Sequence, residues 1–376
     1  MKGLLSRTIG VVTALGTLVA VPAVAQTGTT TDNTAYGTTS AEFLSLGAGA
    51  RAAALGGSFA ALANDVTALY WNPAGVALMD RPGVSVSTYT YVANTRYNWA
   101  GLAFPMSGGE RAIGIQAGTF GFSGQPVYTL ANPEGDGSTY SVSEFFGGLT
   151  YAQNFSDRFS AGITAKMISD NLALTSATAF AVDFGTNFHA QIGARSIRAS
   201  FVISNLGSTL RHTGTGLDVA VIRQPPLDQQ NIPQEAAPAD LKTKDWSLPV
   251  MFRVGVALDL MQSASSRVTL LSEFNQPNNS KPGFNGGLEW ALTNIGNSGF
   301  TAMARGSYSY QSDNSLTITN AAGFNTTLTS QRNQDGLAFG GGLDYDRGQF
   351  GIGIDYAYRS LGVLGGTNFF SATLHW

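Results

Sequence analysis

Apolar side chains alternate with small or polar ones along most of the chain after residue 80. From Gln349 to Arg359 the large apolar residues fall on one side of an extended strand, and glycines and polar residues fall on the other. The apolar side holds Phe350, Ile352, Ile354, Tyr356 and Tyr358, and the opposite side holds Gly351, Gly353, Asp355 and Ala357. The last residues, Thr367 to Trp376, alternate in the same way and end on an aromatic side chain. Strict alternation predicts β-strands with two different faces.

Segments of about ten residues with this pattern recur along the chain. We place them at 84–93, 96–106, 111–121, 143–155, 158–169, 178–189, 195–205, 250–260, 266–276, 283–293, 299–311, 335–346, 349–360 and 367–376. In lipid every backbone N–H and C=O needs a partner within the protein, so spanning strands survive only in a closed barrel. The series of about fourteen strands therefore predicts an all-β, transmembrane antiparallel β-barrel over residues 81–376.

The charged residues of these strands favour a barrel over a soluble sandwich. They lie on the face that is rich in glycine and other small residues, opposite the aromatic and aliphatic face. These predicted lumen-lining residues are Arg253, Asp259, Glu289, Asp344 and Asp355. In a sandwich this face would meet bulk water and carry more Lys and Glu, whereas small residues suit a confined interior that holds a plug.

The connections between the strands fall into two groups. Short turns at Asn94-Thr95, Ser156-Asp157 and Asp346-Arg347-Gly348 are predicted on the periplasmic side, and the longer connections 122–142 and 311–334 outside. The longest, 206–249, contains Pro225, Pro226, Pro233 and Pro238. It is either a solvated linker or a loop that folds over the barrel or binds a partner.

Composition and the N-terminal residues agree with export to a membrane. The chain contains 46 glycines among 376 residues, and only 12% of its residues are charged. That fraction of charged residues is too small to cover the surface of a soluble protein of this size. Lys2 and Arg7 precede an uncharged, largely apolar run, and Ala23-Val-Ala25 follows as a cleavage site. The run is shorter than the roughly 20 residues of a membrane helix. Residues 1–25 are therefore predicted to be a cleaved signal peptide rather than an anchor, and 26–35 a flexible mature N-terminus.

Residues 36–80, before the first strand, are rich in Ala and Gly and too few for an independent domain. They contain Gly47, Gly49, Arg51, Gly56, Gly57, Asp65, Trp71, Asn72, Pro73 and Gly75. We expect a small helical plug in the lumen, with Arg51 and Asp65 pairing with inward charges of the wall. Gly47 to Ala52 also fits the G-x-G-x-x-A dinucleotide fingerprint. That fingerprint needs a strand before it and a βαβ unit around it, so we predict no cofactor.

The segment from Leu46 to Ala77, LGAGARAAALGGSFAALANDVTALYWNPAGVA, resembles the N-terminal signature of the PorV/PorQ family of outer-membrane proteins, which are relatives of the FadL channels. The stretch 146–168 and the Asn205-Leu206-Gly207 element support the resemblance. It implies a fourteen-stranded barrel with an N-terminal plug. It also implies that such proteins work with the type IX secretion system, carrying substrates to a surface sortase or capping the translocon, whereas FadL-like relatives pass hydrophobic molecules through a lateral opening.

Three functions follow as alternatives. The first is a type IX accessory barrel that binds secretion components and secreted proteins through its outer loops. The second is a passive channel for hydrophobic small molecules, expected to show an apolar pocket under the plug and a strand kink. The third, an enzyme, is disfavoured because His189 and His375 have no G-x-S-x-G partner.

The chain has no cysteine and three scattered histidines, so no metal site is expected. The predicted location is the outer membrane of a Gram-negative-type bacterium. Outer-membrane lipid and the barrel-assembly machinery, acting on the C-terminal strand, are expected partners, and nucleic acid is not.

Overall fold

The computed structural model describes residues 37–193, 195–221, 236–311, 314–319, 325–330 and 336–376. The predicted signal peptide, the mature N-terminus before residue 36 and the central part of the Pro-rich connection lie outside the described residues. The chain divides into two compact units. One comprises residues 35–314 and 330–376, and the other includes residues 315–329.

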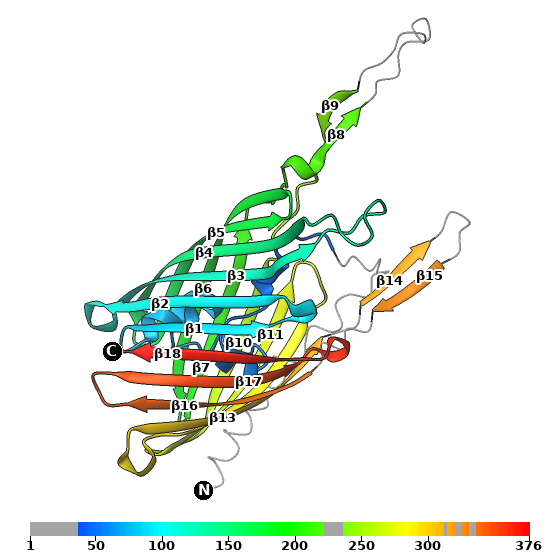
Figure 1. Cartoon of the computed structure of the whole chain (residues 1–376). Helices are drawn as coiled ribbons and strands as arrows, with labels where there is room; N and C mark the ends of the chain where they lie inside the picture. The colour runs from blue at the N-terminus through cyan, green and yellow to red at the C-terminus, as the bar shows by residue number, and fades with distance from the viewer. Residues whose placement is uncertain (1–36, 194, 222–235, 312–313, 320–324, 331–335) are drawn as a thin grey trace, which may run out of the picture. The chain divides into compact units, whose positions relative to one another are not determined.

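A closed antiparallel β-barrel is the main feature of the larger unit (Figure 1). Fourteen strands of the described chain form it, and each pairs with its neighbour in sequence among the barrel strands, while β18 closes the ring by pairing with β1. The strands are β1 (Gly83–Thr90), β2 (Arg96–Met106), β3 (Arg111–Pro126), β4 (Thr139–Ser156), β5 (Phe159–Leu172), β6 (Thr175–Ile192), β7 (Arg195–Gly207), β10 (Met251–Gln262), β11 (Ser266–Pro277), β12 (Gly283–Leu292), β13 (Phe300–Gln311), β16 (Gly336–Asp346), β17 (Gly351–Ser360) and β18 (Gly366–His375). The predicted fold class is confirmed.

The two faces of the strands differ as their sequence predicts. Ile354 and Leu343 point outward and are 63% and 60% exposed, whereas the neighbouring inward positions are buried or half-buried. The outward face is aromatic and aliphatic, as a lipid-facing surface requires. None of the helices among the described residues has the length and apolar character needed to span a membrane.

Antiparallel pairing places successive connections at alternating ends of the barrel. The long connections β3–β4, β7–β10 and β13–β16 share one end, and the turns β4–β5 and β16–β17 share the other with the C-terminus. Long connections are external in outer-membrane barrels. The β1–β2 connection, which holds Asn94-Thr95 and the short helix η3 (Val92–Asn94), lies at the external end. Its predicted periplasmic position was wrong, because a short turn alone does not reveal the end to which it belongs.

Two of the long connections contain hairpins of their own. In the β7–β10 connection, β8 (Asp218–Val221) pairs with β9 (Ala237–Asp240), after the short helix η5 (Thr215–Leu217). In the β13–β16 connection, β14 (Asn314–Thr319) pairs with β15 (Asn325–Ser330). Three further connections contain short helices, which are η4 (Ser107–Gly109), η7 (Ile295–Asn297) and η8 (Gly362–Leu364).

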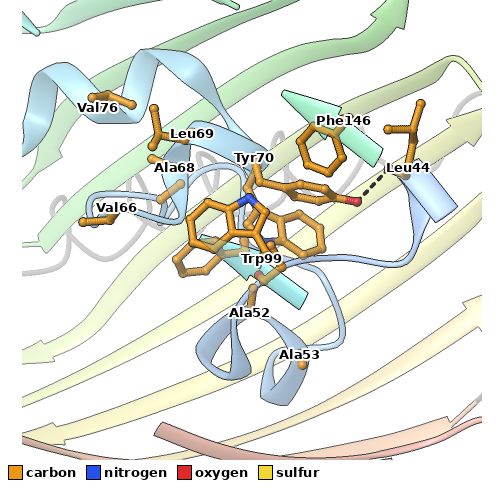
Figure 2. Close-up of a cluster of buried hydrophobic side chains, with 14 of the residues drawn as sticks. Leu44, Ala52, Ala53, Val66, Ala68, Leu69, Tyr70, Val76, Trp99 and Phe146 are labelled. Carbon is orange, nitrogen blue, oxygen red and sulfur yellow. Dashed lines mark hydrogen bonds between the residues drawn. The ribbon is translucent and has the colours of Figure 1, made fainter. Parts of the chain in front are cut away.

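Short helices of residues 42–78 fill the lumen. They are η1 (Glu42–Ser45), α2 (Ala50–Ala54), α3 (Ala68–Trp71) and η2 (Pro73–Leu78). The core of the molecule lies here, because Ala50, Leu55, Phe59 and Leu69 have no exposed surface. Figure 2 shows side chains of this plug, with Tyr70 directed toward Leu44 and Phe146 of the wall beside it.

Candidate functional site: the plug, the outer cavity and the external connections

The plug contains only short helices, and hydrogen bonds of the Tyr70 and Trp71 side chains hold its segments together. The indole N–H of Trp71 donates to the carbonyl of Ala48 at 2.7 Å. The hydroxyl of Tyr70 donates to the carbonyl of Leu44 at 2.7 Å and accepts from the N–H of Gly47 at 3.0 Å. Gly47 has a left-handed φ of 97°, and a Cβ there would lie 3.1 Å from the Trp71 ring. Glycine therefore allows both the backbone conformation and the close approach.

The Trp71-Asn72-Pro73-Ala74-Gly75 motif builds a helix start that also binds the wall. Asn72 caps η2 by accepting from the N–H of Ala74 at 3.1 Å, and Pro73 occupies the first helical position. The amide of Asn72 donates to the carbonyl of Ala60 at 2.8 Å and to that of Thr186, on β6, at 3.1 Å. One side chain thus joins two parts of the plug and the barrel.

A flat patch of the wall receives this motif. Gly162 on β5 and Gly185 on β6 are paired across the strands. A Cβ on Gly162 would lie 2.5 Å from the carbonyl carbon of Pro73, and one on Gly185 would lie 2.2 Å from Oδ1 of Asn72. Any side chain at either position would displace η2 from the wall.

Wall side chains satisfy backbone groups of the plug that lack partners within it. Ser307 and Ser309, on β13, donate to the carbonyls of Ala54 and Gly56 at 2.9 and 3.2 Å. Ser371 accepts from the N–H of Ala50 at 2.7 Å, and Glu273 from that of Ala60 at 2.9 Å. Buried backbone groups need such partners. The plug therefore depends on the barrel for its hydrogen bonds as well as for its packing.

Glu289 is the centre of a charge network between the plug and the wall. It lies on β12 with 1% of its surface exposed and accepts two hydrogen bonds from Arg51, both at 2.9 Å. Arg51 also pairs with Asp65 at 2.7 Å, and Arg305 on β13 joins Glu289 at 2.8 Å. Arg305 in turn reaches Asp355 at 2.5 Å. The structure thus brings four of the sequence-predicted site residues together in one network: Arg51, Asp65, Glu289 and Asp355.

The remaining predicted lumen charges lie at separate places on the inward face. Asp259 accepts from Arg198 at 2.5 Å and from Thr269 at 2.7 Å. Arg253 stands over the Trp71 ring at 5.3 Å and donates to Ser204 at 3.2 Å. Asp344 is opposite Gly353 on the neighbouring strand.

A break in the β6–β7 ladder is closed by residues that the sequence reasoning missed. The register changes between Val182 and Phe184, where Asn205 adopts a left-handed φ of 63°. Asp183 accepts from the N–H of Asn205 at 2.8 Å, and Lys166 of β5 pairs with Asp183 at 2.6 Å. Both charged side chains are at most 2% exposed. A lysine on the inward face of β5, between Ala165 and Met167, was the signal that could have revealed this site.

An outer cavity of about 450 Å³ lies between the plug and the external ends of the strands. The aromatic residues that line it include Phe43, Trp71, Tyr89, Tyr91, Phe120 and Phe369. Gly56, Gly57 and Arg253 also line it, together with Arg359. Within the described residues Arg359 has no ion-pair partner. The channel interpretation expected an apolar pocket under the plug, whereas this cavity is on the external side of it. A second cavity, of about 390 Å³, lies on the opposite side of the plug, and most of the residues that line it are polar.

The base of the Pro-rich connection is fixed to the barrel and the plug. Leu210 and Trp246 exchange two backbone hydrogen bonds, of 2.7 and 2.8 Å, and Leu210 is fully buried. Ser40, at the start of the plug, donates its N–H to the carbonyl of Ser247 at 3.0 Å and its hydroxyl to Asp170 of β5 at 3.2 Å. The connection is therefore anchored below the β8–β9 hairpin.

An exposed ion pair also joins the two arms of this connection. The hydrogen bond from the Arg211 guanidinium, with 2.7 Å from Nε to Oδ1, lowers the pKa of the Asp245 carboxyl. Because both groups are in solvent, the pair contributes little stability.

Comparisons with known proteins agree with this architecture. The family model described as "Type IX secretion system protein PorV" matches residues 29–222. The chain belongs to the PorV family. No curated protein sequence matches it. The matched residues of this chain comprise the plug, β1 to β7 and the start of the Pro-rich connection.

Solved structures of similar fold include channels and transporters. The "CymD monoaromatic hydrocarbon channel" superposes with a TM-score of 0.54 at 11% identity, covering 88% of this chain and 97% of that chain. The toluene transporters TbuX of Ralstonia pickettii and TodX of Pseudomonas putida both give a TM-score of 0.51, at 13% and 12% identity, with the same coverage. At these identities the likeness shows the fold alone. Family and fold together locate the PorV-family chain in the outer membrane.

Proposed function

We propose that this barrel is an accessory of a type IX secretion system and acts through protein partners at its external connections. The observation that carries the proposal is the anchored base of the Pro-rich connection, because it presents the β8–β9 hairpin from a fixed support rather than from a loose linker. Membership of the PorV family supports the same role. The proposal assigns no catalytic step to the chain. Its contacts with lipid through the outward face, and with the barrel-assembly machinery through β18, belong to its insertion.

The charge network of the plug also supports a role at the surface rather than in free passage. Arg51 and Glu289 form a forked pair that is almost fully buried, and wall side chains hold the plug backbone at several strands. Breaking a buried pair by removing one partner costs about 3–5 kcal/mol. A plug held in this way blocks the free passage of solutes through the lumen while the external end remains available.

Removal of the β8–β9 hairpin tests the proposal. Residues 216–242 are replaced by a short Gly-Ser linker, which keeps Leu210, Trp246 and the Arg211–Asp245 pair. We expect the barrel to retain its heat-modifiable mobility on a denaturing gel, because external connections contribute little to the strand ladder. Co-purification of secretion-system components and secreted proteins is expected to be lost. The matched control removes the β14–β15 hairpin instead, and retention of partners by the 216–242 variant would contradict the proposal.

A channel for hydrophobic small molecules is the second candidate, favoured by the aromatic outer cavity of about 450 Å³. Deletion of residues 36–80 removes one side of this cavity and opens the lumen. We expect the deletion to raise permeability to small solutes in reconstituted vesicles. If hairpin removal leaves secretion intact and the plug deletion changes only the uptake of hydrophobic compounds, the channel function replaces the secretion function.

A further inference from the structure

Buried polar groups without protein partners follow a single row across the inner wall. Ser160 on β5 pairs in register with Asn187 on β6, and Asn187 pairs with Ser200 on β7. Ser200 is opposite Gly255 on β10, and Gly255 is opposite Glu273 on β11. The residues form a continuous row on five adjacent strands. Among the described residues, both amide atoms of Asn187, the hydroxyls of Ser160 and Ser200, and Oε1 of Glu273 accept or donate no hydrogen bond.

The row lies on the inward face of the wall, and the plug covers it at Gly255 and Glu273. All four side chains are at most 5% exposed. Glu273 accepts from the N–H of Ala60, and a Cβ on Gly255 would lie 3.3 Å from the N of Ala61. The same Cβ would lie 2.8 Å from the Ser200 hydroxyl and 3.2 Å from Oε2 of Glu273. The missing side chain at Gly255 therefore lets the polar groups on either side of it approach each other.

The row runs from one end of the barrel to the other, because hydrogen-bonded registers are inclined to the axis of a tilted barrel. Ser160 is the second residue of β5, next to the β4–β5 turn at the end of the barrel opposite the external one, here called the turn end. Asn285 and Ser309 continue the row beyond Glu273 and lie near the external ends of β12 and β13. Ser160 also lines a cavity of about 390 Å³ at the turn end. Asn285 and Ser309 line the outer cavity. The row thus joins two cavities on opposite sides of the plug.

We propose that water occupies this row and forms a file between the two cavities, so that the plugged barrel passes water along the wall. Buried polar groups are hydrogen-bonded, and ordered water supplies the partners that the protein does not. Hydroxyl and amide groups at successive positions offer each water both donors and acceptors. Arg253 lies 3.8 Å from Oε1 of Glu273, and this pairing of opposite charges leaves the row without a net charge that would attract ions. The file of waters therefore passes water and not salt ions.

Osmotic shrinkage of proteoliposomes tests the proposal, followed by stopped-flow light scattering with sucrose as the osmolyte. Vesicles with the wild-type protein are expected to shrink faster than protein-free vesicles. The variant Asn187→Val/Ser200→Ala is expected to return the rate to near the protein-free baseline, because apolar side chains interrupt the file. It is expected to fold, since an apolar group in place of a partnerless polar one is tolerated in a buried site.

The matched control is Ser85→Ala/Thr373→Val. These two inward hydroxyls hydrogen-bond each other at 2.9 Å and are outside the row, and their loss is expected to leave the rate unchanged. If the double variant in the row does not show heat-modifiable mobility, Ser200→Val alone takes its place. The proposal is overturned if the wild-type protein adds no water permeability, if the folded row variant matches the wild type, or if the control lowers the rate equally.

Discussion

At the residue scale, side-chain size decides where the plug and wall meet and polarity decides which face meets lipid. Glycines at 162 and 185 admit the plug motif, and outward positions such as Ile354 carry large apolar groups. The two-residue periodicity gave the faces of the strands directly, because every second side chain points the same way. It did not identify Gly162 and Gly185 as plug contacts, since a glycine in a strand has several possible reasons.

The face assignment predicts opposite outcomes for two neighbouring residues of β17. Ile354→Arg places a charge in lipid and is expected to cost about 2–4 kcal/mol near the bilayer midplane. Gly353→Ser points inward, where its Cβ would lie 2.9 Å from a movable Asp344 oxygen, and is expected to be tolerated. The inserted, heat-modifiable fraction of each variant is the measurement. Equal loss for both variants would mean that the two faces are reversed.

The close contact between Gly162 and the plug predicts that one added methyl group at this position lowers the stability of the protein. Gly162→Ala drives a Cβ into the Pro73 backbone and is expected to lower the free energy of unfolding by about 1–3 kcal/mol, as overpacking does. Gly306→Ala is the control, because a Cβ there meets no atom within 4 Å. Two measurements report the effect: limited proteolysis of the plug, and the temperature at which the protein changes its mobility on a denaturing gel. Equal behaviour of the two variants would show that the plug does not rest on β5.

At the element scale, the strand centres were predictable and their ends were not. The fourteen predicted segments overlap the fourteen barrel strands, but β3 to β6 extend further, as in β4 (Thr139–Ser156) against the predicted 143–155. These extensions mix Ser, Thr, Asn and Gly with a few apolar residues such as Phe122 and Tyr140, so the alternation at the strand ends is too short to recognise. The β8–β9 and β14–β15 hairpins were also missed, because their strands of four and six residues are too short to show a clear alternation within a long connection. The β6–β7 irregularity depends on contacts between residues far apart in sequence, which periodicity cannot reveal.

That irregularity predicts a strong dependence on charge pairing. Lys166→Met leaves Asp183 buried without its cation and is expected to destabilise the barrel by about 3–5 kcal/mol. In Lys166→Met/Asp183→Asn the charge is gone while the Asn205 N–H keeps an acceptor, so much of the stability is expected to return. Urea unfolding from lipid vesicles, followed by tryptophan fluorescence, measures both variants. A double variant no more stable than Lys166→Met would show that the pair does not hold β5 to the β6–β7 break.

At the scale of the whole molecule, a closed barrel carries a plug that depends on its wall and external connections whose base is tied to both. The barrel and the plug followed from alternation, the membrane's demand for closed backbone hydrogen bonding and the small size of residues 36–80. The Arg51–Glu289 pairing and the anchoring of Ser40 to Ser247 could not be predicted from the sequence, because they join segments that are far apart along the chain. Fold alone does not choose between secretion and uptake.

Delivery of secreted proteins in a strain that lacks the chromosomal gene tests the central claim most directly. Proteins with a type IX C-terminal sorting domain are counted at the cell surface and in the periplasm. We predict that they accumulate in the periplasm without the gene, that the full-length protein restores surface delivery, and that the protein lacking residues 216–242 inserts but does not restore it. Normal surface delivery in the strain without the gene would contradict the account.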